Sequence, residues 1–158
     1  MYGPIDNTRE YATVAIIRYM KLGCPTRKEY EDKLRREVYD RLAGKNPEHI
    51  FKAAEIEVRK HRALLEDIDA VNKMFDMLLG NISMSDVDID TAVRNGTEIA
   101  NAVNYVYFGL CRVHPSHKRI AERVHTYAMS FPTTERTVYR WLKYARKLFA
   151  VNRGLTIE

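Results

Sequence analysis

Apolar residues recur every three or four positions along almost the whole chain, a spacing that predicts amphipathic helices and an all-α fold. Two capping boxes, in which Asn or Thr precedes Glu by three residues, mark the first helix starts: Asn7 with Glu10, and Thr26 with Glu29. Gly23 and Gly44 are expected to end the two helices that follow. We expect about five to seven helices in all.

The segment 47–79 has no interior Gly or Pro, and Asn46 followed by Pro47 gives it a clear helix start. A heptad-like seam runs along it: Phe51, Ala54, Val58, His61, Leu65, Ile68, Asn72, Phe75 and Leu79. The pattern predicts one long helix, with the polar stretch 59–62 as the alternative point of division into two. Such a seam suits the core of a helical bundle or a homodimer interface.

The chain beyond residue 80 predicts a polar connector and three further helices. These are expected over residues 97–110, from the cap Ser116 to about Met129, and from the cap Thr133 or Thr134 to about Asn152. The organisation that follows has three regions: an N-terminal helical bundle over 1–80, a connector and helix over 81–110, and a C-terminal pair of helices over 111–158.

The last two helices carry facing apolar stripes and are joined by a few residues that include Pro132. The first stripe is Ile120, Val124, Ala128 and Phe131, and the second is Val138, Trp141, Leu142, Ala145, Leu148 and Phe149. Two short helices with a tight connection and facing apolar stripes are typical of a helix-turn-helix.

Composition supports a globular protein of one core, since the 158 residues are 46% hydrophobic with only seven Gly and five Pro. The two cysteines, Cys24 and Cys111, fit a reducing compartment better than a disulfide scaffold. No secretion signal and no long apolar run is present, so we expect no membrane association and a cytoplasmic location.

The positive charge is concentrated in the last third of the chain. Residues 111–158 contain ten Lys or Arg against three Asp or Glu, whereas residues 1–110 contain 16 against 18. A basic segment of this kind indicates a polyanionic partner, with an ordinary solvated basic face as the alternative.

A recognition helix uses residues near its N-terminus to contact base edges, and Arg can pair with guanine through two hydrogen bonds. The candidates for base contacts are Thr134, Glu135, Arg136, Thr137, Tyr139, Arg140 and Lys143. The candidates for phosphate contacts are Ser116, Lys118, Arg119, Arg123, Thr133, Arg146 and Lys147. The expected partner is therefore double-stranded DNA.

The segment Thr134–Leu142, T-E-R-T-V-Y-R-W-L, resembles the S-E-R-T-V-Y-R-W-L recognition helix of sigma-factor region 4 and related regulators. The wider layout is similar to phage transcriptional regulators of the ArpU and RinA type, with D-I-D-A-V at 67–71 and V-Y-F at 106–108. This resemblance, specific only in the C-terminal part, implies a bacteriophage or prophage activator of late genes. Pro132 departs from it, because such turns usually carry Gly there.

Two metal sites are weaker alternatives. Cys111, His114 and His117 are three residues apart, with His125 nearby, but Pro115 interrupts their helix and no second cysteine pair lies close. The aspartates of 86–90 begin like a calcium loop, which then fails because Thr91 and Thr97 replace the required Gly and Glu. No P-loop or nucleophile elbow is present, so we expect no enzyme, no cofactor and no metal.

Two other binding functions stay open. A phage DNA-packaging subunit also joins a helix-turn-helix to oligomerising helices, although its DNA-binding element usually lies near the N-terminus. A protein–protein adaptor could instead contact host RNA polymerase without contacting DNA. A homodimer through the 47–79 segment is a further candidate partnership.

Overall fold

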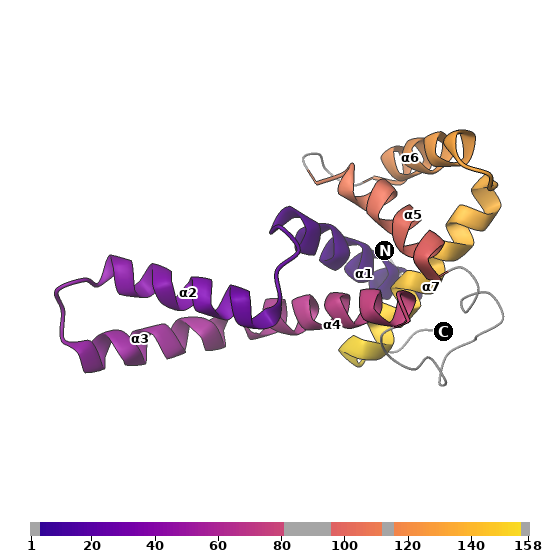
Figure 1. Ribbon diagram of the computed structural model, residues 1–158. Coiled ribbons are helices and arrows are strands. Elements are labelled where there is room, and N and C mark those ends of the chain that lie inside the picture. The colour runs from indigo at the N-terminus through magenta and orange to yellow at the C-terminus, as the bar shows by residue number, and fades with distance from the viewer. Residues whose placement is uncertain (1–3, 81–95, 112–115, 156–158) are drawn as a thin grey trace. The chain divides into compact units, whose positions relative to one another are not determined.

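The computed structural model describes the backbone of residues 4–80, 96–111 and 116–155, and their side chains from Arg9 onward. Every regular element in these ranges is a helix, which confirms the all-α fold (Figure 1). The helices are α1 (Pro4–Lys21), α2 (Arg27–Arg41), α3 (Pro47–Lys60), α4 (Arg62–Leu78), α5 (Gly96–Phe108), α6 (His117–Ser130) and α7 (Glu135–Arg153). None of the helices in these ranges is long and apolar enough to cross a membrane.

The chain forms two compact units, and the boundary between them falls within α4. One unit is the single stretch 25–69, and the other joins residues 1–24 to residues 70–158. This division differs from the predicted regions 1–80, 81–110 and 111–158, because α1 packs with α5 and α7 from the opposite end of the sequence. The helix pair near the C-terminus therefore belongs to a unit that also contains the first helix.

The unit 25–69 is built on a hairpin of α2 and α3. Its apolar contact uses the side chains Leu34, Val38, Ile50 and Ala54, all of which are buried. The guanidinium of Arg35 joins the two helices, because its Nε lies 3.0 Å from Glu55 Oε1. These buried apolar side chains and the cross-helix ion pair hold the hairpin together.

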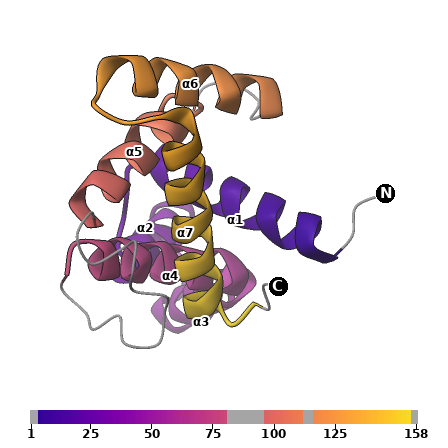
Figure 2. The same cartoon turned by 90° about the vertical axis from the view of Figure 1, so that its right-hand side faces the viewer.

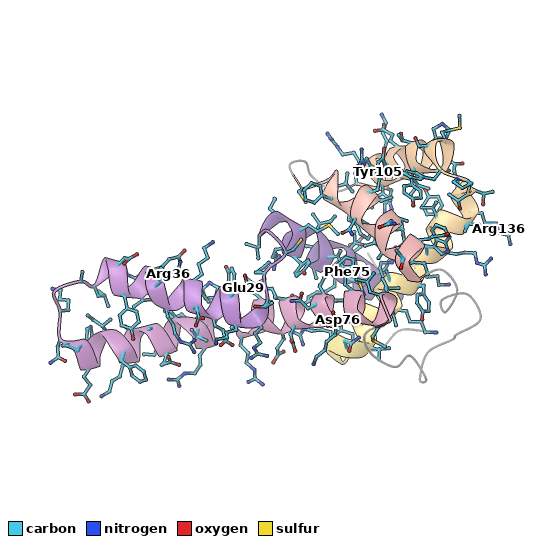
Figure 3. The ribbon with its side chains drawn as sticks, in the orientation of Figure 1. Glu29, Arg36, Phe75, Asp76, Tyr105 and Arg136 are labelled. Atoms are coloured by element: carbon cyan, nitrogen blue, oxygen red, sulfur yellow. The ribbon has the colours of Figure 1, made fainter. Side chains whose placement is uncertain are left out.

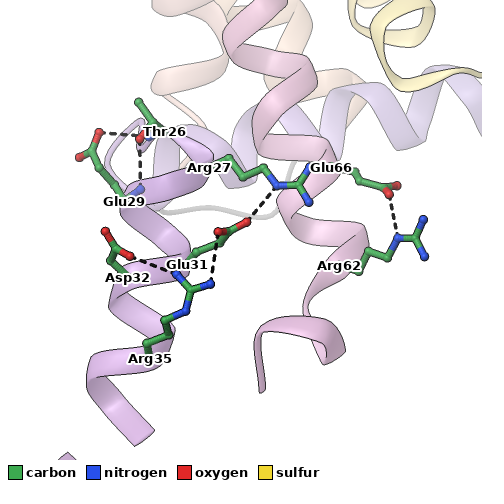
Figure 4. Close-up of polar contacts among 8 residues, drawn as sticks. All are labelled: Thr26, Arg27, Glu29, Glu31, Asp32, Arg35, Arg62 and Glu66. Carbon is green, nitrogen blue, oxygen red and sulfur yellow. Dashed lines mark hydrogen bonds and ion pairs between the residues drawn. The ribbon is translucent and has the colours of Figure 1, made fainter. Parts of the chain in front are cut away.

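The predicted start of α2 is confirmed in detail. The Thr26 hydroxyl accepts a hydrogen bond from the Glu29 amide at 3.1 Å, and the Glu29 carboxylate accepts one from the Thr26 amide at 3.3 Å. Figure 4 shows this capping box together with ion pairs along one side of α2, including Arg27 with Glu31. The box satisfies two amides that have no partner within the helix. Asn46 likewise caps α3, as predicted.

The single long helix predicted over 47–79 is wrong, and the alternative of a division within the polar stretch 59–62 is confirmed, because the chain divides at His61. The His61 amide donates to the Val58 carbonyl at 3.1 Å, an i to i−3 bond that leaves the α-helical pattern. The predicted seam also changes: Phe51 is 57% exposed, whereas its neighbour Ile50 is buried. The prediction that Asn7 caps the first helix is wrong as well, because α1 already begins at Pro4.

The other unit contains α1, α5, α6, α7 and the C-terminal half of α4. Hydrogen bonds tie it together, such as that from the Tyr19 hydroxyl to Asn72 Oδ1 at 2.8 Å. At the start of α5, a Cβ on Gly96 would overlap the carbonyl of Leu78, so the two backbones meet more closely than a side chain would allow. Figure 2 shows α6 crossing near the beginning of α7 and α5 lying beside both.

Candidate nucleic-acid interface

The connection between α6 and α7 consists of residues 131–134 and contains no left-handed residue. Phe131 and Thr134 both have extended backbones, with φ of −130° and −116°. The Thr133 amide donates to the Phe131 carbonyl at 2.7 Å, across Pro132. Because this turn needs no positive φ, proline fits where the resembling regulators usually carry glycine.

The first turn of α7 is fixed by its own polar side chains. The Thr134 hydroxyl accepts from the Thr137 amide at 3.2 Å and donates to the Thr137 hydroxyl at 3.0 Å. The Glu135 carboxylate lies 2.9 Å from His125 Nδ1 on α6, so it bridges the two helices. Three of the predicted base contacts, Thr134, Glu135 and Thr137, are thus already engaged within the protein.

Four cations form a line along the exposed side of α7, which we call the basic stripe: Arg136, Arg140, Lys143 and Lys147. Their spacing of four, three and four residues places them on one face of the helix. At 1.5 Å per residue, the stripe is about 16 Å long. All four are exposed, and none has a hydrogen bond or ion pair with another described residue. Figure 3 shows Arg136 extending away from the beginning of α7. The stripe is therefore available to a polyanion.

The face of α7 opposite the basic stripe is buried, as predicted. Its six predicted apolar residues are all buried: Val138, Trp141, Leu142, Ala145, Leu148 and Phe149. This burial fixes the rotation of α7 about its axis, so the cations must point outward. Tyr139, another predicted base contact, lies beside the stripe and is 44% exposed.

The predicted apolar stripe of α6 is only partly correct. Val124 is buried, but Phe131 is 48% exposed, and Tyr127 supplies the buried aromatic side chain. The Tyr127 ring stacks on Phe131 at 4.4 Å between centroids and lies 5.3 Å from the ring of Tyr105 on α5. No local pattern indicated that Tyr127 would be buried, because tyrosine occurs both in cores and on surfaces.

Arg123, a predicted phosphate contact, is half-buried between α6 and α5. Its guanidinium lies 4.0 Å from the centroid of the Tyr105 ring and donates to the Tyr105 carbonyl at 2.7 Å. A side chain at Gly109 would occupy the same space, so glycine there makes room for the guanidinium. These contacts give Arg123 a structural role in joining α5 to α6.

Arg123→Ala is expected to lower the free energy of unfolding by about 1–2 kcal/mol, because a cation–π contact and a hydrogen bond are lost. DNA affinity per folded molecule is expected to stay unchanged. Urea denaturation and binding to a DNA duplex measure the two effects separately. Lost affinity with unchanged stability would contradict the structural role.

The remaining predicted phosphate contacts lie on both helices. Lys118 and Arg119 are exposed in the first turn of α6, where the Ser116 hydroxyl caps the helix by accepting from the Arg119 amide at 3.2 Å. Arg146 is half-buried and donates to the Tyr107 hydroxyl at 3.0 Å. Thr133 is half-buried within the turn.

The structure brings no metal ligands together in the ranges it describes. Cys111 Sγ instead lies 3.9 and 3.8 Å from the carbonyl oxygens of Ile17 and Tyr107, either of which can accept its single S–H. Burial raises the pKa of this thiol, although nearby Lys21 lowers it, so the thiol form is favoured at neutral pH. The calcium-like segment 86–90 and His114 lie outside the described residues.

One concave site was not predicted from the sequence. It lies where α1, the start of α6 and the middle of α7 meet, and its volume is about 460 Å³. Arg9 and Arg146, from opposite ends of the chain, both line it. No local pattern indicates such a site, because it depends on the packing of α1 with the C-terminal helices.

Comparison of the chain with protein-family models, curated proteins and solved structures found no match.

Proposed function

We propose that the protein is a sequence-specific double-stranded DNA-binding transcriptional regulator of a bacteriophage or prophage, acting in the bacterial cytoplasm through binding and not catalysis. The observation that carries this proposal is the basic stripe on α7, a helix that follows a four-residue turn and is capped by Thr134. In a helix-turn-helix the second helix enters the major groove with its N-terminal residues at the base edges. Arg136 and Arg140 occupy that part of α7.

Charge and exposure distinguish the contacts proposed for this interface. Arg136, Tyr139, Arg140 and Lys143 are the exposed candidates for base contacts. Lys118, Arg119 and Lys147 would neutralise phosphates, which contributes affinity without sequence preference. Thr134 and Thr137 keep the first turn of α7 rigid, which reduces the entropy lost on binding.

The proposal is tested by selecting bound sequences from a random duplex pool with the full chain. We expect an enriched motif whose binding weakens steeply with salt, because phosphate contacts release counterions. A palindromic motif would support the homodimer through 47–79, since two-fold protein symmetry matches two-fold sites. Enrichment of no motif, together with no duplex binding at low salt, would overturn the proposal in favour of a protein–protein adaptor that contacts RNA polymerase.

We further propose that the protein activates transcription, as the resemblance to phage late-gene regulators implies. A reporter gene placed behind the selected motif tests it, with host RNA polymerase as the proposed second partner. Stoichiometry separates the regulator from a packaging subunit. A dimer supports the regulator, whereas a ring of roughly eight or more copies would support packaging.

Lys147→Ala is expected to weaken binding by a similar factor on every duplex, because a phosphate contact carries no sequence information. The slope of log affinity against log salt should become shallower by about 0.9. Titrations of a selected and a scrambled duplex at several salt concentrations measure both effects. A loss confined to the selected duplex would show instead that Lys147 contacts bases.

A further inference from the structure

The cleft between α1, α6 and α7 has the size of a small-molecule site. Its volume of about 460 Å³ falls within the roughly 300–1,000 Å³ of ligand pockets. All of its lining residues belong to the unit formed by residues 1–24 and 70–158: Arg9, Glu10, Thr13, Val14, Ser116, His117, Ile120, Tyr139, Leu142 and Arg146. The site is therefore complete within one compact unit.

The cationic groups of the cleft come from α1 and α7. The Arg146 guanidinium lines the cleft and is anchored by its bond to the hydroxyl of the buried Tyr107, which uses only one of its five N–H donors. Arg9 is exposed on α1. Glu10 is the one acidic residue of the lining, and no ion pair within the described ranges joins it to either arginine. Because the lining contains two arginines and one acidic residue, it favours an anionic ligand.

The N-terminal end of α6 adds to the same electrostatic preference. Ser116 and His117, the cap and first residue of that helix, both line the cleft. The positive end of the helix dipole therefore lies at the cleft, where it favours a negative group in the same direction as the two arginines.

The rest of the lining is apolar or aromatic. Val14, Ile120, Leu142 and Tyr139 line the space. Val14 is 42% exposed, Tyr139 is 44% exposed and Ile120 is half-buried, whereas Leu142 is fully buried. An inorganic phosphate would leave this surface in contact with water. An anion that carries an apolar body would cover it, which is favourable in proportion to the buried apolar area.

We infer that this cleft binds a small organic anion, a phosphate monoester or carboxylate with an apolar or aromatic body. The anionic group faces Arg146 and Arg9, and the body lies against Val14, Ile120 and Tyr139. Tyr139 belongs both to the cleft and to the exposed base-contact candidates on α7. Occupancy should therefore change DNA affinity, a consequence that rests on the proposed function, whereas ligand binding itself does not.

The test uses phenyl phosphate as the probe and follows the methyl resonances of Val14, Ile120 and Leu142 by NMR in the full chain. We expect saturable shifts of these methyl groups, and binding at least several-fold weaker for inorganic phosphate, which lacks the apolar body. Arg146→Gln should weaken phenyl phosphate binding about tenfold, because a charge-assisted hydrogen bond is lost. Arg9→Gln should weaken it by a few-fold, since Arg9 is exposed.

Arg18→Gln is the matched control, because Arg18 is an exposed arginine on α1 that does not line the cleft. Its binding should equal that of the unmodified chain. Because Arg146 is half-buried, thermal melting checks the fold of Arg146→Gln, and Arg9→Gln decides the result if that variant unfolds. Three results would overturn the inference: no saturable methyl shift, equal weakening by Arg18→Gln and Arg9→Gln, or equal affinity for inorganic phosphate and phenyl phosphate.

DNA titrations with and without saturating phenyl phosphate test the coupling to α7. We expect DNA affinity to change by several-fold in the unmodified chain at saturation. At a probe concentration that half-saturates the unmodified chain, the change should be smaller in Arg9→Gln, because this variant binds the probe a few-fold more weakly. Phenyl phosphate binding without any duplex binding would support the cleft and overturn the proposed function. Duplex binding without methyl shifts at the cleft would support the proposed function and overturn the cleft. The two failures are therefore distinguishable.

Discussion

Alanine at Arg136 or Arg140 is expected to cost about 1–3 kcal/mol of specific DNA-binding free energy per substitution, roughly 5- to 150-fold in affinity. Each arginine is exposed in the first two turns of α7, on the face opposite the buried core. An arginine that donates two hydrogen bonds to guanine contributes discrimination of this size. Titration of each variant with a selected duplex and with single-base variants of it measures the loss.

The matched control is Arg36→Ala on α2, an exposed arginine in the other compact unit (Figure 3). It removes the same charge, so it measures the non-specific effect of net charge on DNA binding. We expect a small loss that is equal for selected and scrambled duplexes. Undiminished affinity in both Arg136→Ala and Arg140→Ala would exclude α7 as the recognition helix.

Phe149→Ala is expected to lower the free energy of unfolding by about 3–5 kcal/mol, because a buried aromatic ring is replaced by a cavity. Phe149 is fully buried on α7, and its ring centroid lies 6.3 Å from that of Tyr11 on α1. The substitution therefore weakens the contact between the first and last helices of its unit. Urea denaturation followed by circular dichroism measures the loss.

Val151→Ala provides the comparison for Phe149→Ala, since Val151 lies on the same helix but is exposed. Its effect should stay within about 0.5 kcal/mol. If Phe149→Ala does not fold, the milder Phe149→Leu should still be less stable than the unmodified chain. A loss below about 1 kcal/mol in Phe149→Ala would mean that α1 contributes little to this core.

Most helix starts could be predicted from sequence because their signals are local. Thr26, Asn46, Ser116 and Thr134 each cap a helix through a side chain and an amide only two or three residues away. The apolar face of α7 was equally predictable from its period, and it determines where the basic stripe points. That part of the candidate site follows directly from the order of residues.

Features that depend on contacts between distant residues could not be predicted. Arg123 looks like a surface cation until Tyr105 and Gly109 are placed beside it. The break at His61 was only one of two possibilities, because no Gly or Pro marks it. The division into units and the cleft at Arg9 and Arg146 both depend on α1 packing with helices that lie more than 70 residues later.

The larger unit combines two segments that are far apart in the sequence, and this affects the order in which the chain folds during synthesis. Residues 25–69 form a contiguous unit with local contacts, which can form as soon as that segment leaves the ribosome. The helix α1 is made earlier still, but α5 and α7, against which it packs, are synthesised much later. The part of α1 that packs on α5 and α7 therefore stays exposed to water or to a chaperone until those two helices have been made.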